Sequence, residues 1–283
     1  MTTDHVLHPV PGTAVDHVPG YVHGYSDRET RRLTGQAVTL AALLHRGMSW
    51  PAGSTVLEAG CGVGAQTAHL TAAGPGARIV AVDLDAESLA VARARTPAAD
   101  HPVGWLRADV GRLPFADGAF DHAFVCFVLE HLPHPARALA ELRRVLRPGG
   151  TVTVIEGDHG SAFFHPAGAY ARAVVRHQVR LQAAAGGDAL IGRRLGPLLT
   201  AAGFSAVTVD PLTVYADRTR PALVEGFTRQ TFTAMVAAVR EAAVAAGLTT
   251  AADFDRGVAE LRRTAEGDGT FLYTFMRAVA VSP

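Results

Sequence analysis

The stretch that most constrains this chain is an apolar run that enters a glycine-rich turn, Val-Leu-Glu-Ala-Gly-Cys-Gly-Val-Gly-Ala at residues 56–65. A pattern of apolar residues with helical spacing follows the turn. Glycine is needed where the backbone takes a positive φ or passes close to a ligand, because a Cβ would clash there. A turn that opens a helix also leaves N–H groups free to face a ligand. The stretch therefore predicts a strand, a loop and a helix that cradle a nucleotide.

Strand and helix patterns alternate after this turn. Continuous apolar runs predict strands buried on both faces, at 55–59, 78–83, 103–107, 120–128 and 151–156. Amphipathic stretches between them predict helices, and strand patterns return at 204–215 and 271–281. Such alternation indicates an α/β fold with a parallel, doubly wound sheet.

Composition excludes several classes of function. The 283 residues include no lysine, which removes the P-loop lysine and the Schiff-base lysine of pyridoxal enzymes. The net charge is zero and the arginines are scattered, so we expect no nucleic-acid partner. There is no apolar run of about 20 residues and no signal-peptide pattern, so we expect no membrane partner. Two cysteines suit a reducing cytosol. We expect a cytoplasmic protein that acts on a small molecule.

Polar residues follow every predicted strand, at the sheet edge where open α/β sheets bind ligands. The first three strands lead to Glu58, Asp83 and Asp109. A carboxylate such as Asp83, about twenty residues beyond the glycines, can accept both hydroxyls of a ribose. The glycine spacing also satisfies the dinucleotide fingerprint, so an NAD-dependent dehydrogenase stays open, although it leaves Asp109 without a role.

Four motifs in order carry a resemblance to a known family. They are the glycine turn, Val-Asp83-Leu-Asp, Ala-Asp109 with the Phe120-Asp121 pair that follows it, and Leu-Arg147-Pro-Gly-Gly. This series, over residues 55–156, resembles class I S-adenosylmethionine-dependent methyltransferases. The resemblance implies a Rossmann-like seven-stranded, mostly parallel sheet with helices on both faces, an antiparallel last strand and a helical cap.

The resemblance also implies roles for individual residues. The methionine part of S-adenosylmethionine would lie on the glycine turn, with its ammonium group near Glu58 and the Gly60 carbonyl. Asp83 would hold the ribose and Asp109 the adenine amino group. The full set of expected cofactor-binding residues is Tyr25, Glu58, Gly60, Cys61, Gly62, Gly64, Gln66, Asp83, Leu84, Asp109, Val110 and Cys126. S-adenosylhomocysteine would be the product.

The N-terminal segment Tyr21-x-His-Gly-Tyr25-Ser-x-Arg-Glu29 is similar to bacterial small-molecule methyltransferases of natural-product pathways. Some of these methylate nitrogen and some an electron-rich ring carbon such as indole C3. The resemblance implies an arm and helix at 1–50 that cover the cofactor, a core at 51–216 and 269–283, and a helical insertion at 217–268 over the substrate. Expected substrate-binding residues are Tyr21, Glu29, Phe127, Phe163 and Tyr170.

The function hypothesis is methyl transfer to a small, aromatic or nitrogenous metabolite in secondary metabolism. In-line displacement needs alignment of the two partners about 3 Å apart and exclusion of water. A hydroxyl acceptor would need a base, for which we expect His159, Asp158 and His131. A non-catalytic regulator that binds the same cofactor remains an alternative, and alanine-rich helices at 220–266 allow a homodimer.

Two further interpretations concern metal and aromatic side chains. We expect no metal, because Pro133 disrupts the helix that would bring His131 and His134 onto one face. Seven aromatic residues are interpreted as core, with an aromatic pocket as the alternative: Phe163, Phe164, Tyr170, Phe227, Phe232, Tyr273 and Phe275.

Overall fold

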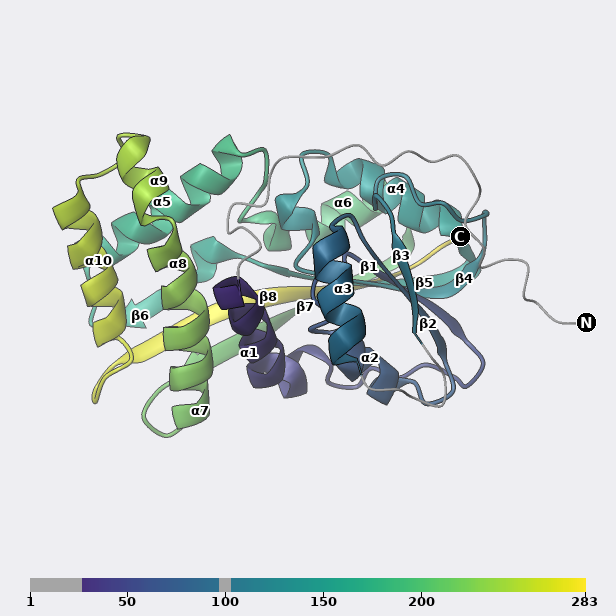
Figure 1. The fold of residues 1–283 in the computed structure, drawn as a ribbon, viewed down its shortest axis with the longest axis horizontal. Helices are drawn as coiled ribbons and strands as arrows, with labels where there is room; N and C mark the ends of the chain where they lie inside the picture. Colours follow the sequence, from purple (N-terminus) through teal and green to yellow (C-terminus); the bar gives the residue numbers. More distant parts are fainter. Residues whose placement is uncertain (1–26, 97–102) are drawn as a thin grey trace, which may run out of the picture.

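A computed structural model describes residues 27–96 and 103–283 of the protein (Figure 1). Tyr21 and Tyr25, with the rest of the expected N-terminal arm, lie outside the described residues. Within the described ranges, no helix combines the length and the apolar character that a membrane crossing requires.

The first part of the chain alternates strands with helices as the sequence predicts. The strands Thr55–Ala59 and Arg78–Asp83 run nearly without interruption through buried positions, which suits a sheet covered on both faces. Asp85 begins one helix by accepting a hydrogen bond from the Ser88 N–H at 2.7 Å, and Pro135 occupies the first turn of another. The elements are α1 (Asp27–Leu44), β1 (Thr55–Ala59), α2 (Thr67–Ala73), β2 (Arg78–Asp83), α3 (Ala86–Arg95), β3 (Gly104–Arg107), β4 (Phe120–Cys126), the 3-10 helix η2 (Leu129–His131), α4 (Pro135–Val145) and β5 (Leu146–Gly157).

The second part completes the sheet. It contributes the 3-10 helix η3 (His159–Ser161), β6 (Phe163–His165), α5 (Ala169–Ala184), η4 (Ile191–Arg194), α6 (Leu195–Ala201), β7 (Ser205–Ala216) and β8 (Thr270–Val281). The sheet order is β3-β2-β1-β4-β5-β8-β6, and β7 pairs with the other side of β8. Strands β1 to β5 are parallel, whereas β8 is antiparallel to β5, β6 and β7. The predicted fold class, with its antiparallel last strand, is confirmed.

Two details of the sheet differ from the prediction. It has eight strands in the described residues rather than seven, because the short segment Phe163–His165 pairs with Thr270–Leu272 of β8. Strand β5 also begins at Leu146 rather than at 151, since Leu146 already pairs with Phe120 before the register shifts.

Helices cover both faces of the sheet. Leu40 and Leu44 of α1 and Leu70 of α2 belong to one buried apolar cluster, whereas Leu142 of α4 and Leu199 of α6 belong to another. Figure 1 shows α1, α2 and α3 in front of the strands and α4 and α6 behind them.

Residues 217–268 form a run of helices between β7 and β8. They are α7 (Pro221–Leu223), the π-helix η5 (Val224–Thr233), α8 (Ala234–Ala238), α9 (Arg240–Ala245) and α10 (Ala251–Arg263). In Figure 1 these helices lie together with α5 beside the end of the sheet that carries β6. A Cβ on Gly226 would lie only 2.2 Å from Thr39 Oγ1, so this glycine lets η5 pack closely against α1. Segments far apart in the chain therefore meet over one edge of the sheet.

Candidate functional site

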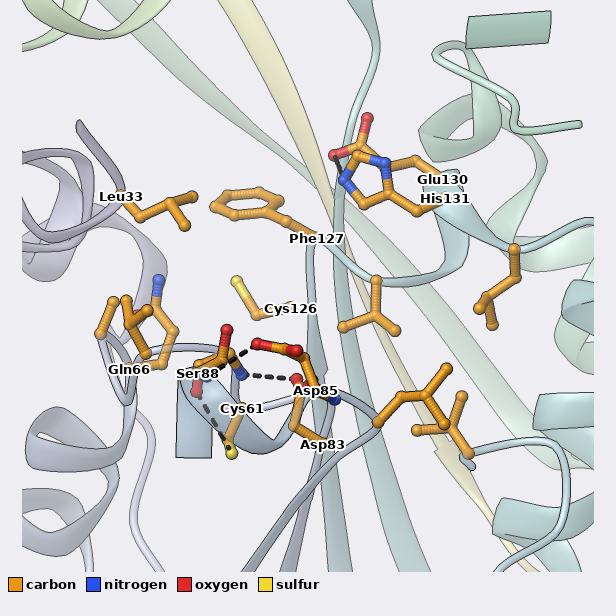
Figure 2. Close-up of a pocket in the computed structure, with 18 of the residues that line it drawn as sticks. Leu33, Cys61, Gln66, Asp83, Asp85, Ser88, Cys126, Phe127, Glu130 and His131 are labelled. Atoms are coloured by element: carbon orange, nitrogen blue, oxygen red, sulfur yellow. Dashed lines mark hydrogen bonds and ion pairs between the residues drawn. The ribbon is translucent and has the colours of Figure 1, made fainter. Parts of the chain in front are cut away.

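A cavity of about 520 Å³ lies at the carboxyl ends of the parallel strands. Its walls come from the glycine turn, the loops after β2, β3 and β4, helix α1, the π-helix η5 and strand β8. Figure 2 shows Leu33 of α1 and Phe127 after β4 pointing toward one another across it, with Asp83 and Asp85 below them in the view. The cavity thus occupies the sheet edge at which the sequence predicts a ligand.

The three glycines of the turn differ in the space that surrounds each of them. Gly60, Gly62 and Gly64 all have positive φ, at 77°, 51° and 72°. A Cβ would lie 2.4 Å from Val128 Cγ2 if placed on Gly60, and 3.0 Å from Ala92 Cβ if placed on Gly64. A Cβ on Gly62 would meet nothing within 4 Å, and Gly62 lines the cavity. Gly62 is therefore the open floor of a cradle, while Gly64 serves the packing of the turn against α3 and lies outside the lining.

Asp83 braces this turn and faces the cavity. Its Oδ2 accepts the Gly62 N–H at 2.7 Å, and its Oδ1 accepts the Asp85 N–H at 2.9 Å. Burial raises the pKa of the Asp83 carboxyl, opposed by these hydrogen bonds. Each carboxylate oxygen can accept a second hydrogen bond. The residue can therefore fix the turn and still accept hydroxyls of a ligand.

Glu58 is buried close to the glycine turn. The side chain is 2% exposed and does not line the cavity, because its Oε2 accepts the Thr67 hydroxyl at 2.7 Å behind the glycine turn. Burial, together with the nearby charge of Asp83, raises the pKa of Glu58 to about 8. The Glu58 carboxyl therefore does not line the cavity, and its expected place near a ligand ammonium group stays a prediction.

The remaining expected cofactor residues of the described chain are brought together. Asp109 lines the cavity after β3 and accepts the Gly111 N–H through Oδ1 at 2.7 Å. Gln66 lines the cavity, and its Oε1 accepts a hydrogen bond from His45 Nε2 at 2.7 Å. The other expected residues in the lining are Gly60, Cys61, Leu84, Val110 and Cys126.

Helix α1 places a charged network on the opposite wall. Glu29 and Arg32 form an ion pair at 2.5 Å, and Arg32 also donates to Gln36 Oε1 at 2.9 Å. All three residues line the cavity. The pairing of Glu29 with Arg32 leaves this wall polar but without a large net charge.

His131 lines the cavity as an uncharged imidazole. Burial, with a contribution from Arg32, lowers its pKa to about 4. Its Nε2 lies 3.7 Å from Glu130 Oε1, a contact that is therefore not an ion pair at neutral pH and too long for a hydrogen bond. An imidazole with this pKa is a weak proton acceptor near neutrality.

The two adjacent residues Asp158 and His159 point to different places. His159 lines the cavity, whereas Asp158 does not. The Asp158 carboxylate is held by two hydrogen bonds from Arg193, at 2.7 and 2.8 Å, and also accepts the Gly160 N–H at 3.0 Å. The structure therefore corrects the expectation that Asp158 faces the reacting groups.

The expected substrate residues also divide. Phe127 lines the cavity, with a φ of 58° and its ring 5.2 Å from that of Phe275. Phe163 is 73% exposed, because alternation along β6 turns the neighbouring Phe164 inward instead. Tyr170 lies on α5 with the Arg256 guanidinium 4.1 Å above its ring. Neither Phe163 nor Tyr170 lines the cavity.

Four other aromatic side chains form a wall at the far end of the cavity. Phe227 and Phe232 of η5 and Tyr273 and Phe275 of β8 line the cavity, with neighbouring ring centroids 4.8–5.8 Å apart among the closest pairs. Sequence reasoning interprets these rings as core, with a pocket as the alternative. Met235 and Thr231 are lining residues that it misses altogether. No local motif identifies them, since Thr231 lies in the π-helix η5 and Met235 in the short helix α8 that follows it. In the described segments, no group of three His, Cys, Asp or Glu side chains is arranged to hold a metal ion.

Comparison with known proteins identifies the class of this fold and site. Residues 57–154 match the methyltransferase domain family. The chain is 38% identical over 185 residues to an uncharacterized 37.1 kDa protein in transposon TN4556 of Streptomyces fradiae, covering 63% of this chain and 52% of that protein. It is 39% identical over 101 residues to the demethylmenaquinone methyltransferase of Thermus thermophilus, covering 36% of this chain and 46% of that protein. The chain thus spans about half the length of the curated relatives it matches.

Solved structures share the fold. The cyclase SpnF matches with a TM-score of 0.52 and 24% identity, covering 86% of this chain and 80% of that one. The phosphoethanolamine N-methyltransferase 2 of Haemonchus contortus, in complex with S-adenosylmethionine, matches with a TM-score of 0.57 and 17% identity, covering 89% and 56%. Residues 57–154 therefore match a methyltransferase domain, as the resemblance noted in the sequence predicts, and the solved structures share the fold.

The residues of the cavity fit this cofactor. Gly62 leaves an open cradle, and Asp83 and Asp109 line the cavity with carboxylate oxygens, which are acceptors of the kind that a ribose diol and an amino group require. The family match favours S-adenosylmethionine over the nicotinamide dinucleotide that the glycine spacing leaves open.

Proposed function

We propose that this protein transfers the methyl group of S-adenosylmethionine to a carbon or nitrogen atom of a small, largely apolar aromatic metabolite in secondary metabolism. The observation that carries the proposal is the division of one continuous cavity into a polar half at β1 to β3 and an aromatic half between η5 and β8. A methyl donor and an aromatic acceptor need two such compartments in direct contact.

The polar half supplies the binding groups for the donor. Gly62, Asp83 and Asp109 would hold the cofactor through its methionine, ribose and adenine parts, with Gln66 and Gln36 at the methionine end. The bound cofactor supplies a methyl group on a positively charged sulfur. The protein's part is to fix that group against the acceptor, since alignment and exclusion of water provide much of the rate enhancement.

The aromatic half supplies a dry, shaped site for the acceptor. Phe227, Phe232 and Phe275 are each at most 3% exposed in the folded chain, and the cavity reaches their inner faces. A site of this kind excludes water and favours a flat apolar molecule. His131 is a weak proton acceptor, which supports an acceptor atom that is already nucleophilic, such as an amine nitrogen or an electron-rich ring carbon.

Two further observations support a small-molecule acceptor. A curated relative is named as a demethylmenaquinone methyltransferase, which acts on a small molecule. The sequence has zero net charge, and its 26 basic residues are scattered along the chain rather than gathered in the clusters that favour nucleic-acid binding.

Calorimetric titration with S-adenosylhomocysteine tests the proposal. We expect one-site binding by the protein, followed by methylated products when indoles, aromatic amines and phenols are screened with S-adenosylmethionine. Absence of binding would refute the proposal, and binding of NADH in the same assay would favour a dehydrogenase. Tight binding without a methylated product in any screen would instead favour a non-catalytic regulator.

A further inference from the structure

A buried tyrosine and histidine form a hydrogen-bonded pair at the aromatic end of the cavity. The phenol oxygen of Tyr273 on β8 lies 2.9 Å from Nδ1 of His159, which begins η3. Their rings are 5.8 Å apart and nearly perpendicular, at 75°. Both residues line the cavity, and both are less than 10% exposed. The partner that orients His159 is therefore Tyr273, not the adjacent Asp158.

The end of β5 is shaped to permit this contact. A Cβ on Gly157 would lie 2.4 Å from the Tyr273 hydroxyl and 3.7 Å from His159 Cε1. Any larger residue at this position would push the phenol away from the imidazole. Gly157 has no positive φ that would by itself require glycine. Its role is therefore to leave space for the tyrosine–histidine pair.

The hydrogen-bond pattern determines which imidazole nitrogen carries the proton. Burial keeps the pKa of Tyr273 well above its ordinary value, so the phenol retains its proton. Within the described residues, His159 Nδ1 is the hydrogen-bond partner of the phenol, so the phenol proton is donated to Nδ1. A neutral imidazole that accepts at Nδ1 carries its own proton on Nε2.

The Nε2–H group faces a weak acceptor inside the cavity. Nε2 lies 3.4 Å from the Met235 sulfur, and Met235 is itself a lining residue of the flexible thioether type. A thioether sulfur accepts hydrogen bonds weakly, so an oxygen atom of a bound molecule can replace it.

We propose that Tyr273 is a positioning residue that holds His159 in its Nε2–H tautomer, so that the acceptor site selects an aromatic compound bearing a hydrogen-bond-accepting oxygen. This inference rests on the proposed function and adds to it the chemical class of the acceptor. It assigns His159 the role of hydrogen-bond donor to the substrate, in place of the general base that the sequence suggests.

The tautomer can be measured directly. Protein with 15N-labelled histidine rings is saturated with S-adenosylhomocysteine, and long-range proton–nitrogen correlation spectra identify the protonated nitrogen of each imidazole. The His159 signals are assigned by their loss in His159→Gln. We expect the Nε2–H tautomer in the unaltered protein, and a mixed or Nδ1–H form in both Tyr273→Phe and Gly157→Ala. An Nδ1–H tautomer in the unaltered protein, or no change in either variant, would overturn the inference.

Binding of two matched probes tests the selection. The bicyclic ketone 1-tetralone and its parent hydrocarbon tetralin differ only by a carbonyl oxygen, and each is titrated into protein saturated with S-adenosylhomocysteine. We expect 1-tetralone to bind about 5- to 10-fold more tightly, which is typical of one added hydrogen bond. The preference should persist in His159→Gln, whose amide reaches the Nε2 position, and should disappear in His159→Leu.

The outcomes separate this inference from the proposed function. Lack of S-adenosylhomocysteine binding would defeat the proposed function itself. Normal S-adenosylhomocysteine binding with equal affinity for the two probes, including no measurable binding of either, would overturn the selection of an oxygen while leaving the cofactor site intact. Phe163→Ser, which alters an exposed ring outside the cavity, is the matched control and should match the unaltered protein.

Discussion

The two halves of the cavity are built in different ways. The polar half comes from consecutive strand ends of one α/β unit, and its key groups lie within the residues that form the methyltransferase domain match. The aromatic half joins η5, β8 and the end of β5, which are distant in the chain. The polar half is a local motif, in which most residues shape the glycine turn or accept hydrogen bonds from backbone N–H groups. The aromatic half depends on how the insertion folds back over the sheet, so it can change without disturbing the polar half.

The largest effect is expected at Asp83, which both braces the glycine turn and faces the ligand. Replacement by alanine removes the acceptor of the Gly62 and Asp85 N–H groups as well as the proposed ribose contact. Hydrogen bonds to a charged group contribute about 1.5–3 kcal/mol each, so we expect S-adenosylhomocysteine affinity to fall by at least about 100-fold in calorimetry.

Asp117→Asn provides a control, since this carboxylate is 81% exposed and lies outside the cavity. Its affinity should stay within twofold of the unaltered protein. If an Asp83→Ala protein remained folded and bound S-adenosylhomocysteine normally, Asp83 would not belong to the cofactor site. The assignment of the polar half to the cofactor would then be contradicted.

Sequence information was sufficient for the polar half because each group there follows from short-range rules. A glycine turn, a strand end and a cap are all set by neighbours within about thirty residues, so the sequence places Gly62, Asp83 and Asp109 at one edge. The sequence does not indicate that the Glu58 carboxyl turns back to Thr67, because this contact depends on how the turn packs. The same holds for Asp158, since Arg193 is a distant partner.

Short-range sequence rules could not predict which side chains form the aromatic half. Strand alternation does separate Phe163 from Phe164, but which of the two faces inward depends on the pairing of β6 with β8. The contribution of Thr231 depends on π-helical geometry, which the sequence pattern does not indicate, and Met235 follows on α8 directly after the π-helix. The tyrosine–histidine pair joins residues 114 positions apart.

A smaller effect, visible in pH dependence, is expected at Glu58. Its pKa of about 8 in the folded protein lies above the ordinary value of 4.5, so the folded state binds a proton that the unfolded state releases between these values. The free energy of unfolding should therefore fall as the pH rises through this window. Glu58→Gln keeps an acceptor for Thr67 but cannot ionise, and should be more stable than the unaltered protein by about 1–3 kcal/mol near pH 9.

The measurement is chemical denaturation of both proteins between pH 5 and pH 9, and the difference between them isolates Glu58 from other titrating groups. The gap should be smallest at pH 5 and should widen toward pH 9. A constant gap would mean that Glu58 is already ionised in the folded state and that the polar half holds a buried charge.

Asp158 should affect stability without affecting the ligand. Alanine there removes the Arg193 pair and the cap of η3, but Arg193 is half-exposed and solvent screens the pair. We expect a loss of about 1–2 kcal/mol in the free energy of unfolding and S-adenosylhomocysteine affinity within twofold. Asp158→Asn, which keeps an acceptor for the Gly160 N–H, should lose less. A stable Asp158→Ala protein with strongly reduced methyl transfer would instead support the catalytic role that the sequence analysis expects for Asp158.

The smallest effect is expected at Phe163, and it sharpens the boundary of the aromatic half. This ring is 73% exposed on the short strand β6, so Phe163→Ser should change the free energy of unfolding by no more than about 0.5 kcal/mol. The adjacent Phe164 is 6% exposed and stacks on Phe271 at 5.9 Å, so Phe164→Ser is the matched control and should be destabilised by about 3 kcal/mol or more. Denaturation curves of the two variants test this difference. If Phe163→Ser weakened binding of 1-tetralone, β6 would have to contribute to the acceptor site, and the aromatic half would extend beyond η5 and β8.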